Sequence, residues 1–540
     1  MPASVEKQAS NAPPPDAPRG RSWTAPHLPF LAFASLEVWH RLLYRPRAHI
    51  PGRYLPRMIL GIVVSCIITV ITLPERLIVD AWLRLRRRKT GLPGPVFILG
   101  YYRSGTTHLQ FLLSRDPNLY SPRWTQTLTP RGFAVSWNLL NFFLLPLFPD
   151  KRPQDNAAFG TDIPAEDDFA LANAALASSL VGRHVVPQHR DFYDRFHDLN
   201  GLSGEELERW QREQKGFLDR IGLLAGARRV LLKTPSHTAR VAALLHLLRD
   251  YEGTRFIHIS RKPEATYRSN LGLHKVLNER YHLQDPLPEE EIEARVVQEY
   301  LATERKYLAE RGEIPNRRHA EIRMEDLLAD PLGEIQRLYE QLELPYTPEF
   351  EQRLLEYLDA NRSYEPNRHR ESASEKERLA MEQLEPLRLQ FRHDQPAIPK
   401  KEPGTPTSMQ PAVRGKLLRS AMIQGLLVGL ATLLPLTALT WITGLRLDGL
   451  VWLSGIAVGL RSITIARRGC LGLGIWNAAV TLLVGMAGTL ITTGILQGDG
   501  GHGFRDLLQS TWDNIPLVPV IFWYLLGTLG AFRLGTRRWI

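Results

Sequence analysis

The sequence predicts an α/β domain, in which helices flank a parallel sheet, followed by an all-α bundle of four transmembrane helices. Three short apolar runs, at 95–99, 229–232 and 255–259, each lead into a polar loop and then into a helical pattern. Strands that alternate with helices are typical of a parallel sheet. Four long apolar stretches predict the transmembrane bundle, and they cover approximately 417–444, 450–465, 471–496 and 515–534.

The composition and net charge of the chain limit which partners and cofactors it can have. The chain has 540 residues and a formal net charge of +11. This positive charge has two possible explanations. Arginine and lysine often flank membrane segments, and a positive surface attracts an anionic ligand or lipid. The sequence has no basic ribbon interleaved with aromatic residues and no helix-turn-helix pattern, which argues against nucleic acid as a partner. Its two cysteines, Cys66 and Cys470, cannot build a disulfide framework or a zinc cluster, so we expect no metal.

The chain divides into five predicted regions. Residues 1–55 form a disordered, basic N-terminal region without the features of a signal peptide. Residues 56–90 form a membrane-associated helix, and residues 91–394 form the α/β domain. A linker rich in proline and lysine covers 395–415, and the transmembrane region covers 416–540.

The apolar run at 58–73 has about 16 residues, whereas a helix that crosses a bilayer needs about 20. Basic residues flank the run on both sides, so the charge rule gives no orientation. We favour an interfacial or re-entrant helix. A true transmembrane helix and a buried helix of the α/β domain remain the alternatives.

Charge is unevenly distributed among the loops of the C-terminal region. Arginine and lysine gather before the first apolar stretch, between the second and third, and after the fourth. The two other loops carry more aspartate. The positive-inside rule therefore predicts a multi-pass membrane protein whose α/β domain faces the cytoplasm.

A glycine-bounded loop, Gly100 to Thr107, connects the first predicted strand to a helix, which is the context of a phosphate-binding loop. Backbone N–H groups of such a loop and of the first helical turn point at an anion. The lysine of a nucleotide triphosphatase is replaced here by Thr106, and the cation comes earlier, at Arg103. This P-loop-type pattern suits a donor that joins one phosphate to one sulfate and needs no magnesium. A strand–helix turn without a ligand is the alternative.

Two further strand ends carry candidate ligand-binding residues. Lys233 begins the segment KTPSH directly after the run at 229–232, and Arg261 follows the run at 255–259. Ser269 lies eight residues after Arg261 in the next predicted helix. Open α/β sheets bind ligands at the carboxyl ends of their strands, which makes Lys233 and Arg261 candidates for binding.

The segments FILGYYRSGTTHL, LLKTPSH and FIHISRKPEATYRSN resemble the signature regions of the sulfotransferases that use 3′-phosphoadenosine 5′-phosphosulfate (PAPS). The resemblance covers about 96–344, and it is greatest to the bacterial branch with the motifs PRSGTT and KTPSH. It implies the sulfotransferase fold, PAPS as co-substrate and transfer of a sulfuryl group to a hydroxyl. The C-terminal R-K-G segment of the soluble branch is missing from this sequence.

The resemblance also implies roles for the donor-binding residues. Arg261 and Ser269 would bind the 3′-phosphate, the arginine through paired hydrogen bonds. The loop residues that would bind the 5′-phosphosulfate are Arg103, Ser104, Gly105, Thr106 and Thr107.

Sulfuryl transfer needs a cation at the leaving oxygen and a base for the acceptor hydroxyl. Lys233 is our candidate for the cation, with Arg103 sharing the charge. The acidic turn that contains Glu166 resembles a segment of the bacterial branch in which a carboxylate acts as base, and we choose Glu166. His237 is the rival base. The acidic turn can also be explained by the preference of first helical turns for carboxylates.

The sequence does not directly identify the acceptor of the sulfuryl group. The neighbouring membrane segments and an apolar, aromatic stretch at 133–148 favour a hydroxyl on a lipid or glycolipid, although that stretch could equally be core. Two other function classes remain. A P-loop nucleotide or small-molecule kinase would need a lysine where Thr106 stands, and a membrane scaffold that binds a nucleotide would show no turnover. The oligomeric state is left open by the sequence.

Overall fold

The structure is a computed structural model of the whole chain. It describes residues 29–44, 48–85, 93–133, 136, 160–361, 374–401, 411–433 and 471–497, together with short pieces between 437 and 532.

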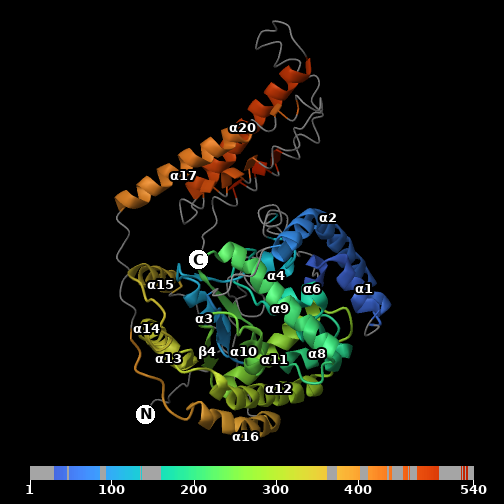
Figure 1. Ribbon diagram of the computed structural model, residues 1–540, viewed down its shortest axis with the longest axis vertical. Coiled ribbons are helices and arrows are strands. Elements are labelled where there is room, and N and C mark those ends of the chain that lie inside the picture. Colours follow the sequence, from blue (N-terminus) through green and yellow to red (C-terminus); the bar gives the residue numbers. More distant parts are fainter. Residues whose placement is uncertain are drawn as a thin grey trace, which may run out of the picture.

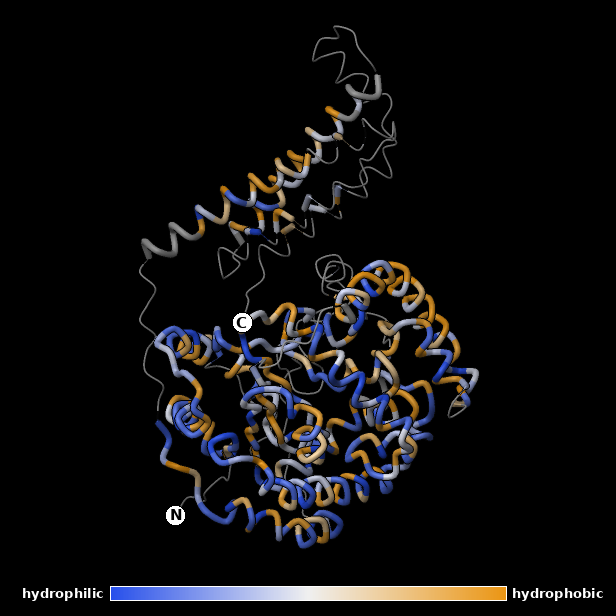
Figure 2. Tube along the Cα trace, in the orientation of Figure 1, coloured by the Kyte–Doolittle hydropathy of each residue, from blue (hydrophilic) through white to orange (hydrophobic). Residues whose placement is uncertain are grey.

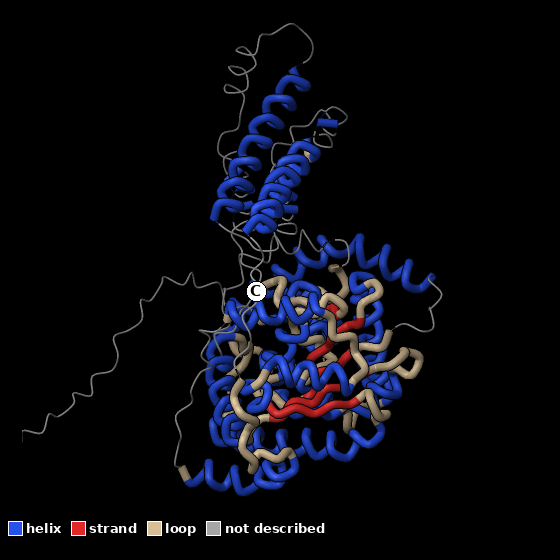
Figure 3. Tube along the Cα trace, turned by 90° about the vertical axis from the view of Figure 1, so that its left-hand side faces the viewer, coloured by secondary structure: helices blue, strands red, loops and turns tan. Residues whose placement is uncertain are grey.

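Five parallel strands form the centre of the α/β domain, in the order β2-β3-β1-β4-β5. Figure 3 draws the strands in red, surrounded by helices. Their bounds are β1 Val96–Leu99, β2 Leu119–Tyr120, β3 Arg229–Lys233, β4 Arg255–Ser260 and β5 His319–Arg323. In the register of the sheet, Phe97 of β1 lies beside Leu232 of β3 and Phe256 of β4. The predicted parallel sheet is therefore confirmed, and its three predicted strands are the three central ones.

Helices cover both faces of the sheet (Figure 1). They are α3 (Thr106–Leu113), α4 (Trp124–Leu128), α6 (Asp168–Ala175), α7 (Leu180–His184), α8 (Arg190–Asp198), α9 (Gly204–Ala225), α10 (Val241–Leu247), α11 (Pro263–Arg280), α12 (Glu289–Glu310), α13 (Met324–Ala329), α14 (Pro331–Gln341), α15 (Pro348–Ala360) and α16 (Glu375–Gln390). Single 3-10 turns cover Pro187–His189, Pro235–Ala239 and Arg311–Glu313.

The strand side chains alternate between two cores. Val96 and Ile98 of β1 point into a core that α3, α13, α14 and α15 complete. Phe97 and Leu99 point into the larger core, to which α8, α9, α10 and α12 contribute. Because both faces are covered, the central strands are apolar throughout, which is why they appear in the sequence as short continuous apolar runs.

The N-terminal region is more ordered than the sequence suggested. We expected 1–55 to be disordered, but Phe30–Phe33 is a 3-10 helix (η1), Leu36–Tyr44 is helix α1 and Gly52–Tyr54 is a further 3-10 turn. Val38 and Trp39 of α1 are buried against the domain, and their burial accounts for the order.

The apolar run at 58–73 belongs to one long helix, α2 (Leu55–Leu85), which continues through Pro74. In Figure 1, α2 lies along the outside of the α/β domain.

Two helices in the described part of the chain are long and apolar enough to cross a membrane, by length and composition. They are Gly52–Leu83 and Gly472–Ile491, in which an 18-residue window has a mean hydropathy of 2.2 and 1.6, respectively. Figure 2 shows apolar residues along the length of both helices. The C-terminal region contains α17 (Pro411–Ala431) and α20 (Leu471–Gln497), which agree with the first and third predicted stretches. Most of the second and fourth stretches, 450–465 and 515–534, lies outside the described residues, so the four-helix bundle stays a prediction.

Candidate active site

The loop after β1 has the backbone of an anion-binding turn. Gly100 and Gly105 have φ angles of +140° and +104°, and Arg103 between them is also left-handed, at +70°. A Cβ on Gly100 would lie 2.3 Å from the carbonyl oxygen of Ile259. Both glycines are therefore required by the fold of the loop. The hydroxyl oxygen of buried Ser104 has no hydrogen-bond partner among the described residues, which fits a polar ligand at this loop.

The loop and the end of β4 come together as the sequence predicted. Arg103 Nε donates to Ser269 Oγ at 2.9 Å, and Arg261 Nη1 donates to the carbonyl oxygen of Arg103 at 3.3 Å. Ser269, on α11, is buried, whereas the two arginines are half-buried. Arg103 thus contacts two residues that lie 158 and 166 positions further along the chain, and the two arginines form one cationic cluster.

Lys233, at the end of β3, connects the loop to the acidic turn. Its Nζ lies 2.5 Å from Glu166 Oε1 and donates to Thr107 Oγ1 at 3.3 Å. The lysine is almost wholly buried, and the Glu166 side chain keeps 18% of its surface exposed. A buried cation therefore lies between the first turn of α3 and a carboxylate that solvent can reach.

The three consecutive carboxylates before and at the start of α6 have three different partners. Glu166 pairs with Lys233, Asp167 accepts a hydrogen bond from His237 Nε2 at 2.8 Å, and Asp168 pairs with Arg240 at 2.9 Å. The Asp167–His237 and Asp168–Arg240 pairs are fully buried, which leaves Glu166 as the carboxylate that can meet a substrate.

His237 occupies a position in the core. Its side chain is fully buried, its ring makes an edge contact with Phe97 at 5.2 Å, and its Nε2 is taken up by Asp167. Because an acceptor hydroxyl cannot reach a ring enclosed in this way, the geometry favours Glu166 over His237 as the base.

Asp167 gives a prediction for acid stability. Burial would raise the pKa of its carboxyl, but the charge of His237 and hydrogen bonds from His237, Gln214 and Thr234 outweigh that effect and lower the pKa to about 2. The stabilisation is therefore present above pH 4, near the ordinary pKa of about 3.9, and is lost as the pH falls towards 2; it amounts to about 2 kcal/mol. In detergent, thermal melting from pH 5 to pH 2 should be less acid-dependent in Asp167→Asn than in the parent. The exposed variant Glu382→Gln should keep the parent's dependence.

Two features of the site were missed by sequence reasoning. The hydroxyl of Thr238 accepts from the N–H of Gly100 at 2.7 Å and so holds the start of the loop. The guanidinium of Arg183 lies 4.0 Å from the centre of the Tyr102 ring and pairs with Glu299. Burial would raise the pKa of Glu299, but Arg183 and neighbouring cations lower it to about 2. These partners are more than eighty residues apart, and no local pattern marks such pairs.

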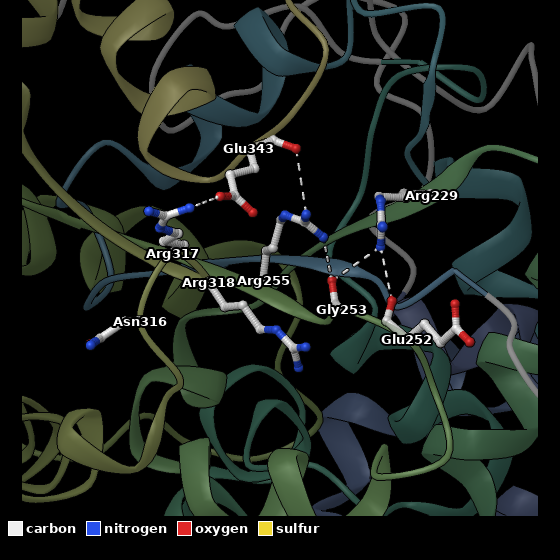
Figure 4. A pocket seen from close by; sticks show the side chains of 8 residues that line it. All are labelled: Arg229, Glu252, Gly253, Arg255, Asn316, Arg317, Arg318 and Glu343. Atoms are coloured by element: carbon white, nitrogen blue, oxygen red, sulfur yellow. Dashed lines mark hydrogen bonds and ion pairs between the residues drawn. The ribbon is translucent and has the colours of Figure 1, made fainter.

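A second cationic feature lies at the opposite edge of the sheet. A hollow of about 320 Å³ is lined by eight residues, among them Arg229, Arg255 and Arg318, at the amino-terminal ends of β3, β4 and β5 (Figure 4). Arg229 Nη1 donates to the carbonyl oxygens of Gly94 and Gly253, at 2.7 and 3.1 Å, and Arg255 donates to that of Leu342 at 2.5 Å. Two arginines of this hollow therefore bind backbone carbonyls of the protein itself.

Comparison with known proteins identifies the family. Residues 95–348 match the family model described as "Sulfotransferase family". Over 353 residues the chain is 30% identical to the omega-hydroxy-beta-dihydromenaquinone-9 sulfotransferase Stf3 of Mycobacterium bovis and to that of Mycobacterium tuberculosis, covering 65% of this chain and 87% of each relative. The chain belongs to the sulfotransferase family. It is therefore an enzyme that transfers a sulfuryl group, as its motifs predicted.

Two solved structures are also similar to this sulfotransferase. The crystal structure of sulfotransferase STF9 from Mycobacterium avium aligns with a TM-score of 0.46 and 19% identity, over 68% of this chain and 98% of that one. The crystal structure of sulfotransferase STF1 from Mycobacterium tuberculosis aligns with a TM-score of 0.45 and 17% identity, over 65% of this chain and 93% of that one.

Proposed function

We propose that this sulfotransferase takes its sulfuryl group from PAPS and transfers it to a hydroxyl of an apolar, lipid-like acceptor. The contact between Arg103 and Ser269, with Arg261 beside them, is the observation that carries the donor assignment. It places cations from two strand ends around one site, as a nucleotide with phosphate at both its 3′ and 5′ positions requires. The loop of residues 103–107 would hold the 5′-phosphosulfate, and Arg261 with Ser269 the 3′-phosphate.

Lys233 and Glu166 have different roles in the proposed transfer reaction. Lys233 and Arg103 stabilise the negative charge that develops on the leaving oxygen, and Glu166 accepts the proton of the attacking hydroxyl. Lys233 contacts both Glu166 and Thr107 of the loop. When the donor is bound, Lys233 can turn from the carboxylate to the donor oxygen, which leaves Glu166 able to act as base. No metal ion is needed in this scheme.

The lipid acceptor is supported by two observations. The mycobacterial relatives carry the name omega-hydroxy-beta-dihydromenaquinone-9 sulfotransferase. This chain itself carries two helices apolar enough for a membrane. We further propose that the enzyme is a multi-pass membrane protein whose catalytic domain faces the cytoplasm. The aromatic stretch at 133–148, which also suggested a lipid, lies almost entirely outside the described residues.

Lipid extraction tests the acceptor. Cells with and without the gene are labelled with radioactive sulfate, and their lipids are separated by mass. We expect a sulfated lipid that depends on the gene and is missing in cells carrying Glu166→Gln. Sulfate found only in water-soluble metabolites would contradict the lipid acceptor while leaving the sulfotransferase activity intact.

Calorimetry tests the donor. We expect 3′-phosphoadenosine 5′-phosphate to bind the purified full chain and ATP to bind much more weakly, because only the former carries the 3′-phosphate that Arg261 and Ser269 would hold. The kinase alternative requires the reverse order of affinity. The scaffold alternative allows nucleotide binding but no sulfated product.

Replacing Arg261 with alanine should weaken donor binding about 10- to 100-fold, since a hydrogen bond to a charged group contributes roughly 1.5–3 kcal/mol. The affinity for 3′-phosphoadenosine 5′-phosphate should fall by this factor, whereas kcat at saturating PAPS should change little. Arg378→Ala is the matched control, because it removes the same charge from an exposed position on α16. Unaltered affinity in Arg261→Ala would remove Arg261 from the donor site.

A further inference from the structure

Helix α2 has an inner face that is fixed to the α/β domain. Trp39 Nε1 donates to Ser65 Oγ at 2.7 Å, and the backbone N–H of Ser136 donates to Glu75 Oε2 at 2.6 Å. Five residues after Glu75, Asp80 pairs with Arg220 of α9. Contacts on this face therefore extend over at least four turns of the helix and include two carboxylates.

The opposite face of α2 is apolar and exposed. Its side chains recur at intervals of three and four residues, so they form one stripe along the helix. Figure 2 shows this apolar helix at the edge of the domain. The stripe includes Ile59, Val63, Ile67, Val70, Leu77 and Ile78, which are between 50% and 72% exposed. Soluble surfaces do not usually carry an apolar strip of this length, which indicates a partner.

The residues at the end of the stripe indicate what that partner is. Trp82 is 45% exposed, and the sequence directly after α2 carries Arg86, Arg87, Arg88 and Lys89. Tryptophan is enriched where membranes meet water, and clustered cations are attracted to anionic lipid headgroups. An aliphatic stripe followed by an aromatic residue and a cationic run matches a lipid surface in both polarity and charge.

We propose that α2 lies in the plane of a membrane, with its exposed stripe among the lipids and its inner face on the catalytic domain. A helix that crossed the bilayer would have to place Glu75 and the Asp80–Arg220 pair in hydrocarbon or give up their contacts. An in-plane helix keeps all of these contacts and covers only the apolar stripe. This assignment does not depend on which acceptor the enzyme uses.

Docking through α2 brings the bilayer close to the base. The 3-10 helix η1 packs between α2 and α6, and the ring of its Phe30 lies 5.1 Å from the ring of Phe169. Phe169 follows Glu166 by three residues. Helix α2 and η1 would thus lie between a lipid bound at the stripe and the acidic turn.

Fluorescence quenching of the full chain in vesicles of phosphatidylcholine and phosphatidylglycerol tests the proposal. Cys66 is exposed on α2 and takes an environment-sensitive fluorophore once Cys470 is replaced by serine. Ile59→Cys and Ile78→Cys, each in a background without other cysteines, place the probe near the two ends of the stripe, about 28 Å apart along the helix. Leu389→Cys on α16 is the control, since Leu389 is 54% exposed, much like Ile59 at 56%.

We expect the three α2 probes to be quenched by spin-labelled lipids at one shallow depth, about 5–10 Å below the headgroups, and protected from iodide. The control probe should be quenched by iodide. Different depths at Ile59→Cys and Ile78→Cys would show a helix that crosses the bilayer, and iodide quenching equal to the control would show a face in water. Protection from both quenchers would show a face covered by protein, from this chain or a second copy. Each of these three results would overturn the proposal.

Discussion

Replacing Lys233 with methionine should lower kcat about 10²- to 10³-fold, the usual cost of removing one group that stabilises charge in a transition state. Methionine keeps much of the volume of this buried side chain, whose Nζ lies 2.5 Å from Glu166. Because the loss arises in the chemical step, the affinity for 3′-phosphoadenosine 5′-phosphate should change far less than kcat. Steady-state kinetics with labelled PAPS and calorimetry measure the two quantities separately.

A structural collapse in Lys233→Met must be distinguished from a chemical defect. Lys215→Met is the control, because it removes a lysine of α9 that pairs with Asp250 away from the loop. Circular dichroism should show the same melting behaviour in both variants. The double variant Lys233→Met/Glu166→Gln should lose less than the product of the two single losses, since the two side chains act as a unit. A Lys233→Met enzyme that is folded and retains most of its kcat would refute the assigned role.

Replacing Glu166 with glutamine should lower kcat about 10²- to 10⁴-fold, the range over which a general base contributes. The amide keeps the size of the side chain but cannot accept the proton of the acceptor hydroxyl. Steady-state kinetics of both enzymes at saturating PAPS make the comparison.

His237→Asn separates the two candidate bases. Since His237 is fully buried and bonded to Asp167, its loss should lower the melting temperature, while the folded fraction should keep much of its activity. A Glu166→Gln enzyme with full activity, together with a folded but inactive His237→Asn enzyme, would transfer the role of base to His237.

The contact between the loop after β1 and the residues that follow β4 was largely predictable because its signals are local. Gly100 and Gly105 take positive φ angles that few other residues tolerate, and the loop lies between a buried strand and a helix. Arg261 and Ser269 follow another strand end, and parallel strands deliver their carboxyl ends to the same edge of the sheet. The meeting of Arg103 and Ser269 was therefore implied by the order of strands and loops.

Which of the three adjacent carboxylates is accessible was beyond local sequence patterns, although the resemblance to the acidic turn of the bacterial branch favoured Glu166. Glu166, Asp167 and Asp168 are consecutive and chemically alike, so their order in the chain cannot say which of them meets a substrate. Their partners are Lys233, His237 and Arg240, which come from a segment 67 to 72 residues further on. Packing of that segment against α6 buries two of the carboxylates and leaves the third accessible.

By itself, the sequence determined the strand–loop–helix units and the glycine-bounded loop after the first strand, because glycine conformation and apolar periodicity act over a few neighbouring residues. Its motifs carried the resemblance to the sulfotransferase family. Tertiary structure decided what depends on distant contacts. It enclosed His237 in the core, directed Glu166 to Lys233, and fixed one face of α2 to the domain through Ser65, Glu75 and Asp80 while leaving the other exposed. The physical reason is that burial is a property of packed surfaces, and a surface exists only once segments far apart in the chain have met.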